Sequence, residues 1–168
     1  MAYWQLFYHC VWPTNGFKPL LTEEHASTVH QLIGDRVQSL GGTLYAVGGM
    51  ADHVHIAAAI PPQMAISVFM GQIKSWSSGQ INRKKLLPAR FTWHESYGVH
   101  SFDRRRLPNV MAYVDQQAEH HAAGTTIPVL ERTFGDPSPV AHDPHQNFYI
   151  DNQAWLKEML TMDAVVFE

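Results

Sequence analysis

The sequence predicts an α+β fold in which an antiparallel sheet carries helices on one face. The segments follow the order strand, helix, strand, strand, helix, strand, which is typical of a split βαβ arrangement. A chain of 168 residues with 45% hydrophobic residues is most simply one globular domain with its own core. The helices are recognised by 3.6-residue periodicity and by start and stop signals, and the strands by alternation or continuous apolar character.

The first strand and helix have clear limits. Residues 3–12 are aromatic and apolar throughout, which indicates a buried strand, and residues 13–16 (PTNG) end it. Thr22 then begins a helix whose first turn is acidic, and apolar residues recur at helical spacing up to Leu40. Gly41-Gly42 stops this helix.

Two strands and a second helix come next. Residues 43–50 and 53–60 are predicted strands joined by a short turn, and Ile66 begins a helix that runs to about Asn82. Residues 91–93 and 97–102 are two short strand-like pieces.

A third helix begins at Pro108, which suits a first turn, and runs to about His121. Beyond Gly124 the pattern weakens. We predict a loop over residues 134–148 and a short helix over residues 152–162. The predicted domain therefore spans residues 1–125, followed by an acidic C-terminal extension, 126–168, that is mostly loop.

Charge is distributed unevenly along the chain. The net charge is −3, yet eight of the twelve basic residues fall within residues 71–106, where only two acids oppose them. These eight are Lys74, Arg83, Lys84, Lys85, Arg90, Arg104, Arg105 and Arg106. The window indicates a local anion-binding surface on an acidic body, although a solvated basic face would have the same composition.

Several classes of protein are excluded. The single cysteine, Cys10, rules out an internal disulfide and a cysteine metal cage. No apolar run is long enough to cross a bilayer, and the N-terminus lacks the features of a signal peptide. We therefore expect a cytoplasmic protein without a membrane partner.

The segment Asp52-His53-Val54-His55-Ile56 is the first candidate site. Side chains alternate along a strand, so His53 and His55 share one face with two alanines, while Val54 and Ile56 face the core. A His-x-His pair beside small residues favours metal binding, although a lone histidine is more often structural.

The second candidate site lies on the third helix. Tyr113 and Gln117 are one turn apart on the same face, with His120 close to that face. Taken alone, this is an ordinary amphipathic helix. Together with His53 and His55, the Gln117 carbonyl oxygen could complete a site for Mg²⁺ or Mn²⁺ that leaves positions open for substrate oxygens. Such a cation could polarise a phosphodiester for attack by Tyr113.

These segments together resemble a known family, the single-tyrosine HUH transposases of small bacterial insertion sequences, including the REP-associated tyrosine transposases. The resemblance covers roughly residues 5–122. It is carried by Tyr8-His9-Cys10-Val11-Trp12, Met50-Ala51-Asp52-His53-Val54-His55-Ile56, Ile73-Lys74-Ser75-Trp76-Ser77-Ser78, Trp93-His94-Glu95-Ser96-Tyr97-Gly98-Val99 and residues 113–121 (YVDQQAEHH).

The resemblance implies a ferredoxin-like HUH nuclease domain with an added tyrosine-bearing helix, usually assembled as a homodimer. It implies that His53, His55 and Gln117 bind a divalent metal and that Tyr113 is the nucleophile. The implied activity is nicking and rejoining of single-stranded DNA at hairpin-marked ends through a 5′-phosphotyrosine. We expect the DNA to contact Lys74, Arg83, Lys84, Lys85, Arg104, Arg105 and Arg106. The sequence leaves open whether Tyr113 serves its own subunit's site or the partner's.

Two other classes of function remain. The net acidic charge would also fit a domesticated descendant that binds hairpin DNA without cutting it. Other histidine-dependent hydrolases fit less well, because histidine-triad enzymes need a third histidine where this chain has Ala57, and amidohydrolase barrels need about 250 residues.

Overall fold

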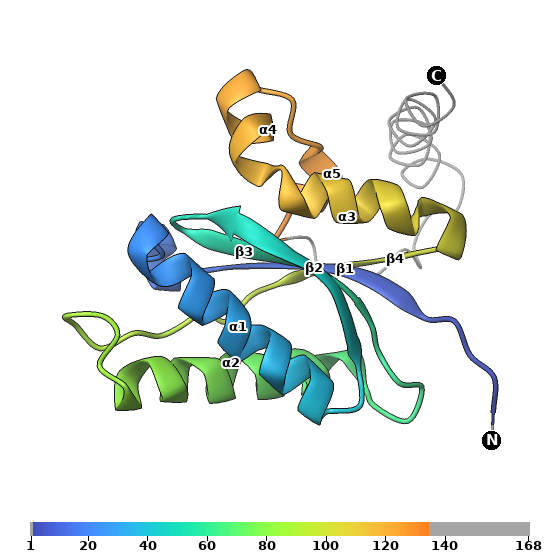
Figure 1. Ribbon diagram of the computed structural model, residues 1–168, viewed down its shortest axis with the longest axis horizontal. Coiled ribbons are helices and arrows are strands. Elements are labelled where there is room, and N and C mark those ends of the chain that lie inside the picture. The colour runs from blue at the N-terminus through green and yellow to red at the C-terminus, as the bar shows by residue number, and fades with distance from the viewer. Residues whose placement is uncertain (1, 135–168) are drawn as a thin grey trace.

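A four-stranded antiparallel sheet is the centre of the molecule. The computed structural model describes residues 2–134. The strands are β1 (Phe7–Pro13), β2 (Thr43–Met50), β3 (His53–Ala59) and β4 (Gly98–Phe102). They lie in the order β2-β3-β1-β4 (Figure 1). The two central strands are therefore β3 and β1, and β3 carries the histidine pair.

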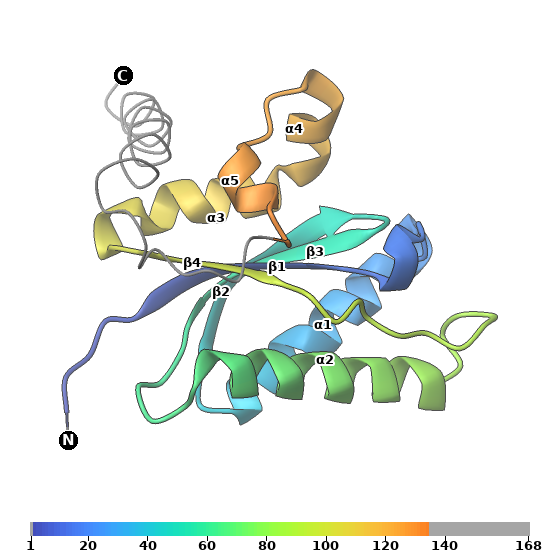
Figure 2. The same cartoon turned by 180° about the vertical axis from the view of Figure 1, so that it is seen from behind.

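Helices cover both faces of this sheet. The helices α1 (Glu23–Ser39) and α2 (Ile66–Arg83) pack on one face, while the later helices lie over the other (Figures 1 and 2). The later helices are α3 (Leu107–Asp115), α4 (Gln117–Ala123) and α5 (Pro128–Glu131). Two short 3₁₀ turns, η1 (Asn15–Phe17) and η2 (Arg104–Arg106), follow β1 and precede α3. This confirms the predicted α+β class with an antiparallel sheet and an added tyrosine-bearing helix.

The alternation predicted for the third segment is confirmed. Val54, Ile56 and Ala58 are fully buried in the core between the sheet and α1 and α2. Ala57 lies on the other face, in a smaller cluster with Val110 and other residues of α3 and β2. His55 shares the face of Ala57, because residues two apart on a strand point the same way.

Two predicted elements differ in the structure. Residues 91–93 form no strand, and Trp93 makes only an isolated bridge with Thr14. Trp93 is nevertheless buried, and its indole N–H donates to Ser77 Oγ at 2.9 Å, so the apolar run reflects core packing. The third helix is not continuous, because Gln116 leaves helical geometry (φ −103°, ψ 28°) and divides it into α3 and α4.

Other predictions fall largely beyond the described residues. The loop predicted over 134–148 lies outside them except for Phe134, and the helix predicted over 152–162 lies wholly outside. Within residues 2–134, no helix is both long enough and apolar enough to cross a membrane.

Candidate active site

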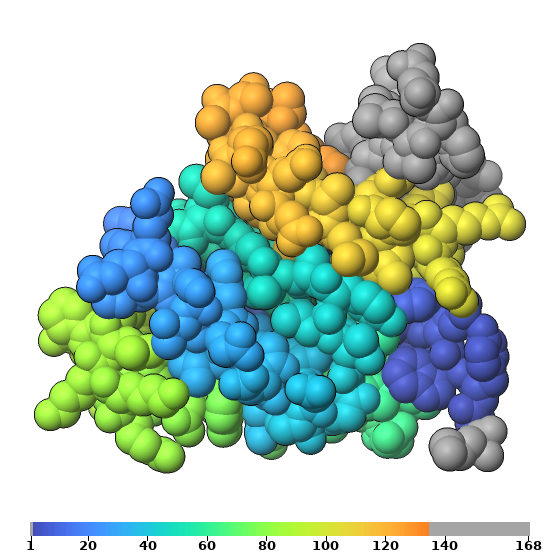
Figure 3. Space-filling model, in the orientation of Figure 1, coloured from blue at the N-terminus to red at the C-terminus, as the bar shows by residue number. Residues whose placement is uncertain are grey.

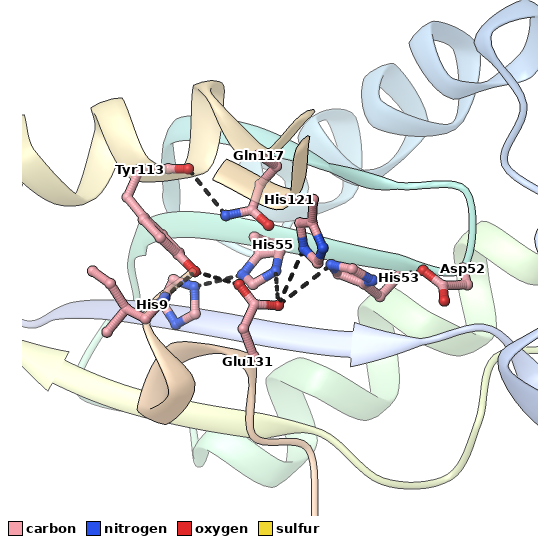
Figure 4. A network of polar contacts seen from close by, with 9 residues as sticks. His9, Asp52, His53, His55, Tyr113, Gln117, His121 and Glu131 are labelled. Carbon is pink, nitrogen blue, oxygen red and sulfur yellow. Dashed lines mark hydrogen bonds and ion pairs between the residues drawn. The ribbon is translucent and has the colours of Figure 1, made fainter. Parts of the chain in front are cut away.

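The histidine pair presents its Nε2 atoms to one point above the sheet (Figure 4). His53 Nδ1 lies 2.7 Å from Oδ1 of Asp52, and His55 Nδ1 lies 2.8 Å from Nε2 of His9. With both Nδ1 atoms engaged, each ring turns its Nε2 atom toward the carboxylate of Glu131. This is the orientation that a metal-binding imidazole requires.

Glu131 joins the histidines to the tyrosine. Its Oε2 atom lies 3.5 Å from His53 Nε2, 3.2 Å from His55 Nε2 and 3.6 Å from His121 Nε2. Its Oε1 atom accepts a hydrogen bond from the Tyr113 hydroxyl. Burial raises the pKa of the Glu131 carboxyl, but the facing histidines and the Tyr113 hydroxyl outweigh burial and lower the pKa to about 2. The carboxylate is therefore ionised at neutral pH.

Tyr113 lies beside the histidine pair of its own chain. The residue is buried, and its hydroxyl oxygen also accepts a hydrogen bond from the backbone N–H of Ile127 at 3.0 Å. Burial, followed by the hydrogen bond to Glu131, raises the pKa of the phenol above its ordinary value. As it stands in the structure, the phenol is therefore protonated at neutral pH, and a positive charge nearby would lower its pKa.

A glycine allows the tyrosine helix to approach the sheet closely. A Cβ atom at Gly48 would lie 2.1 Å from the backbone oxygen of Val114. Gly48 pairs with His55 across β2 and β3, so α3 contacts the backbone of β2 directly beside this histidine. Ala57, Val110 and Val114 complete the contact. The space-filling view shows α3 and α4, in yellow and orange, seated on the β2–β3 hairpin (Figure 3).

Gln117 and His121 bring α4 into the site. Gln117 is buried, and its Nε2 atom donates to the backbone oxygen of Tyr113 at 3.1 Å. His120 lies beside the tyrosine as predicted, with its ring centroid 4.8 Å from that of Tyr113, and its Nδ1 atom lies 3.0 Å from Thr125 Oγ1. The break at Gln116 changes the register of the helix, so His121 rather than His120 faces the Glu131 carboxylate.

The donor set fits a divalent cation. Within residues 2–134, five buried side-chain atoms of the site have no assigned hydrogen-bond partner: Nδ1 of His9, Oε1 of Gln117, and Nε2 of His53, His55 and His121, which face the Glu131 carboxylate. One ligand atom each from His53, His55 and Glu131 lies within 4.8 Å of the others. Burial lowers the pKa of His55 and so favours the neutral imidazole that metal binding requires. Imidazole nitrogens with carboxylate and amide oxygens suit a divalent metal such as Mn²⁺.

The predicted DNA-binding residues do not form one surface. Arg83, Lys84 and Lys85 are exposed at the end of α2, whereas Arg104 and Arg105 are exposed before α3, on the other face of the sheet. Lys74 Nζ donates to the backbone oxygens of Glu95 and Ser96, at 2.9 and 3.1 Å. Arg106 pairs with Asp103 at 2.9 Å, and Asp103 also caps the 3₁₀ turn η2. DNA contact by these residues stays a prediction.

Three site residues were missed from the sequence. Glu131 belongs to a four-residue helix with Pro128 at its start, which is too short for periodicity to reveal. His121 was missed because an unbroken helix was assumed. His9 was quoted only as part of a motif, although a histidine inside an apolar strand was itself a signal, because buried polar side chains need partners.

Comparison with known proteins gives the family. The sequence model of the family described as "Transposase IS200 like" matches residues 2–117. The chain belongs to this family. Family membership implies a DNA-cleaving enzyme that depends on metal, in agreement with the donor set around Glu131. A curated relative is ISDra2 transposase TnpA of Deinococcus radiodurans, which is 24% identical over 119 residues, covering 68% of this chain and 85% of the relative.

Solved structures share the fold. A protein assigned as a transposase, from Deinococcus radiodurans R1, superposes with a TM-score of 0.55 at 24% identity, over 70% of this chain and 95% of that chain. A REP-associated tyrosine transposase bound to a REP hairpin gives a TM-score of 0.53 at 11% identity, over 75% of this chain and 76% of that chain. At these identities the likeness establishes the architecture.

Proposed function

We propose that this transposase nicks and rejoins single-stranded DNA at hairpin-marked ends through a covalent 5′-phosphotyrosine on Tyr113. One observation carries the proposal. A single carboxylate, that of Glu131, faces the Nε2 atoms of His53 and His55 through one oxygen and accepts the Tyr113 hydroxyl through the other. The nucleophile is thereby held next to the atoms that would bind the metal.

His53, His55 and Glu131 would hold the cation, with Gln117 Oε1 and His121 Nε2 as further donors from α4. A Mg²⁺ or Mn²⁺ ion bound there would supply positive charge, which stabilises the phosphorane-like transition state and lowers the pKa of a neighbouring phenol. The proposed donors and Tyr113 all lie in one chain, so we propose that Tyr113 serves the site of its own subunit. Homodimer formation stays a prediction.

In the proposed reaction, Tyr113 attacks the phosphodiester and Glu131 accepts the phenolic proton. The Tyr113 oxygen forms a bond to phosphorus while the bond from phosphorus to the 3′-oxygen breaks. The phenolic proton leaves by way of Glu131 Oε1, its hydrogen-bond acceptor, to solvent, and the departing 3′-oxygen takes up a proton. The products are a 5′-phosphotyrosine and a free 3′-hydroxyl. Attack by the 3′-hydroxyl of another strand reverses these steps and rejoins the DNA without ATP.

Access to the nucleophile requires a local movement. The Tyr113 hydroxyl has both of its hydrogen bonds satisfied, one to Glu131 and one from the Ile127 N–H, and the residue is 2% exposed. A phosphodiester can reach the phenolic oxygen only after the contact with Ile127 is released. Substrate binding and displacement of the segment before α5 are therefore coupled.

The proposed DNA partner follows from charge and from the family. Exposed arginines and lysines at the end of α2 and before α3 would contact phosphates. The relative whose structure contains a REP hairpin supports a hairpin as the recognised shape.

The test is formation of a covalent adduct. The protein is incubated with Mn²⁺ or Mg²⁺ and with single-stranded hairpin DNA from the flanks of its own gene, and the products are separated on a denaturing gel. We expect an adduct that depends on metal, is lost in Tyr113→Phe and persists in the control Tyr3→Phe, whose ring is 85% exposed. His55→Ala should lose cleavage through loss of metal.

Other outcomes of this assay separate the alternatives. An adduct in Tyr113→Phe would refute the assignment of the nucleophile. Hairpin binding without an adduct, with either metal and the correct flanks, would favour a descendant that binds DNA without cutting it.

A further inference from the structure

A fully buried histidine on β1 lies next to the site and has no role in the reaction described above. His9 is 0% exposed, and its Nε2 atom lies 2.8 Å from Nδ1 of His55. A polar side chain in such a place is costly unless a hydrogen bond compensates for its burial.

The strand register explains how the two rings meet. His9 pairs with Ala57 across β1 and β3, while His55 pairs with Val11, so His9 and His55 are diagonal neighbours on one face. Ala57 leaves space above the sheet, and the two ring centroids are 5.0 Å apart. The contact is therefore fixed by the register of two central strands.

The direction of the hydrogen bond between His9 and His55 follows from the proposed role of His55 as a metal ligand. A histidine that binds a cation through Nε2 keeps its proton on Nδ1, and that proton needs an acceptor. The atom facing Nδ1 of His55 is Nε2 of His9, which accepts only when His9 carries its own proton on Nδ1, an atom with no hydrogen-bond partner among residues 2–134. Asp52 is the corresponding acceptor for His53, because its Oδ1 atom lies 2.7 Å from Nδ1 of His53.

The two supporting residues differ in their access to water. The Asp52 side chain is 41% exposed, so water can replace its carboxylate as the acceptor for His53. His9 is enclosed, and water cannot replace it without opening the core. The tautomer of His55 therefore depends on His9 more strictly than that of His53 depends on Asp52.

We propose that His9 is a positioning residue that holds His55 with its proton on Nδ1 and its Nε2 lone pair directed at the metal position. The inference rests on the proposed function, because it assumes that His55 is a metal ligand. Loss of an outer partner of this kind lowers metal affinity by about 10–100-fold.

The experiment measures Mn²⁺ affinity and the His55 tautomer separately from activity. Free Mn²⁺ is quantified by electron paramagnetic resonance during titration of the metal-free protein, and ¹⁵N-histidine NMR reports which ring nitrogen of His55 carries the proton. His9→Leu should weaken Mn²⁺ binding about 10–100-fold. His9→Gln places a carbonyl oxygen where Nε2 stood, so it should restore affinity to within a few-fold and keep the proton on Nδ1.

Each outcome bears on one of the two claims. Failure of the wild-type protein to bind Mn²⁺ would refute the metal centre of the proposed function. Wild-type binding, with the His55 proton found on Nε2 in the Mg²⁺-bound protein, would overturn the role of His9 whatever the variants do. Equal affinities in wild type and His9→Leu would also overturn it. Thermal unfolding without metal shows whether either variant has lost its fold.

Discussion

The close approach of α3 to the sheet predicts that Gly48→Ala will impair catalysis. The added methyl group would lie 2.1 Å from the backbone oxygen of Val114, whereas real Cβ contacts under 3.0 Å are essentially never seen. The obstacle is backbone rather than a flexible side-chain end, so α3 or β2 must move by about 0.9 Å, the difference between these distances. Val114 follows Tyr113 directly, and the movement therefore displaces the proposed nucleophile.

Gly48→Ala should change both the rate of adduct formation and the stability of the fold. Displacement of a reacting group by about 1 Å lowers the rate by about 100-fold, so adduct formation should fall by roughly that factor. Overpacking costs about 1–3 kcal/mol of unfolding free energy, which corresponds to a decrease in Tm of about 2–12 °C for a chain of this size. Activity should therefore be impaired well below the melting temperature of the variant.

The assay compares single-turnover adduct formation at saturating Mn²⁺ with Mn²⁺ affinity and Tm. Gly79→Ala is the matched control, because a Cβ atom at this α2 position would meet nothing within 4 Å. We expect the control to equal the wild type or to be slightly more stable, as helical Gly→Ala changes usually are. Gly48→Ala with a wild-type adduct rate and wild-type Tm would refute the claim that this contact positions Tyr113.

Three further predictions follow from other parts of the structure. Mixing the variants Tyr113→Phe and His55→Ala should not restore adduct formation if Tyr113 serves its own subunit, as its contact with Glu131 beside His55 of the same chain suggests. Ser77→Ala should lower the unfolding free energy by about 1–3 kcal/mol, measured by denaturant titration, because it removes the acceptor of the buried Trp93 indole N–H. Burial raises the pKa of Cys10 from 9.0 to about 12. The native thiol should therefore resist alkylation at pH 9, and stability should fall as pH rises from about 9 to 12, since the unfolded thiol loses its proton first.

Controls for these predictions come from the same chain. Ser78→Ala removes only an exposed hydrogen bond to Ser75 and should leave stability nearly unchanged. Cys10→Ala should abolish the corresponding part of the pH dependence. Activity restored by mixing would mean that the tyrosine helix is exchanged between subunits, and rapid alkylation of the folded protein would contradict the burial of Cys10.

The fold was largely predictable because its main elements carry strong local patterns. The apolar run of β1, the capped periodicity of α1 and the alternation of β3 each identify their element without tertiary information. Residues 91–93 were misassigned because buried aromatic residues have the same composition in a strand and in a packed loop. The break at Gln116 has no local signal, since neither glycine nor proline lies there.

The site was predictable only where its residues share an element. His53 and His55 are two apart on one strand, and Tyr113 lies one turn from Gln117, so spacing alone brought each pair together. His9, His121 and Glu131 enter the site through strand register, a helix break and a four-residue helix. Pairing across strands and docking of short helices depend on the whole fold, which a single sequence does not specify locally.

The position of Glu131 limits where the chain can be shortened without loss of a site residue. It lies beyond residue 125, where sequence patterning predicts that the nuclease domain ends, and Leu130 beside it is buried against the rest of the molecule. Shortening the chain at residue 125 would remove a carboxylate from the site while leaving every strand intact. A C-terminal segment exchanged between relatives would therefore bring its own residue to the position of Glu131, and a hybrid that received no carboxylate there would keep the sheet and lose one candidate metal ligand.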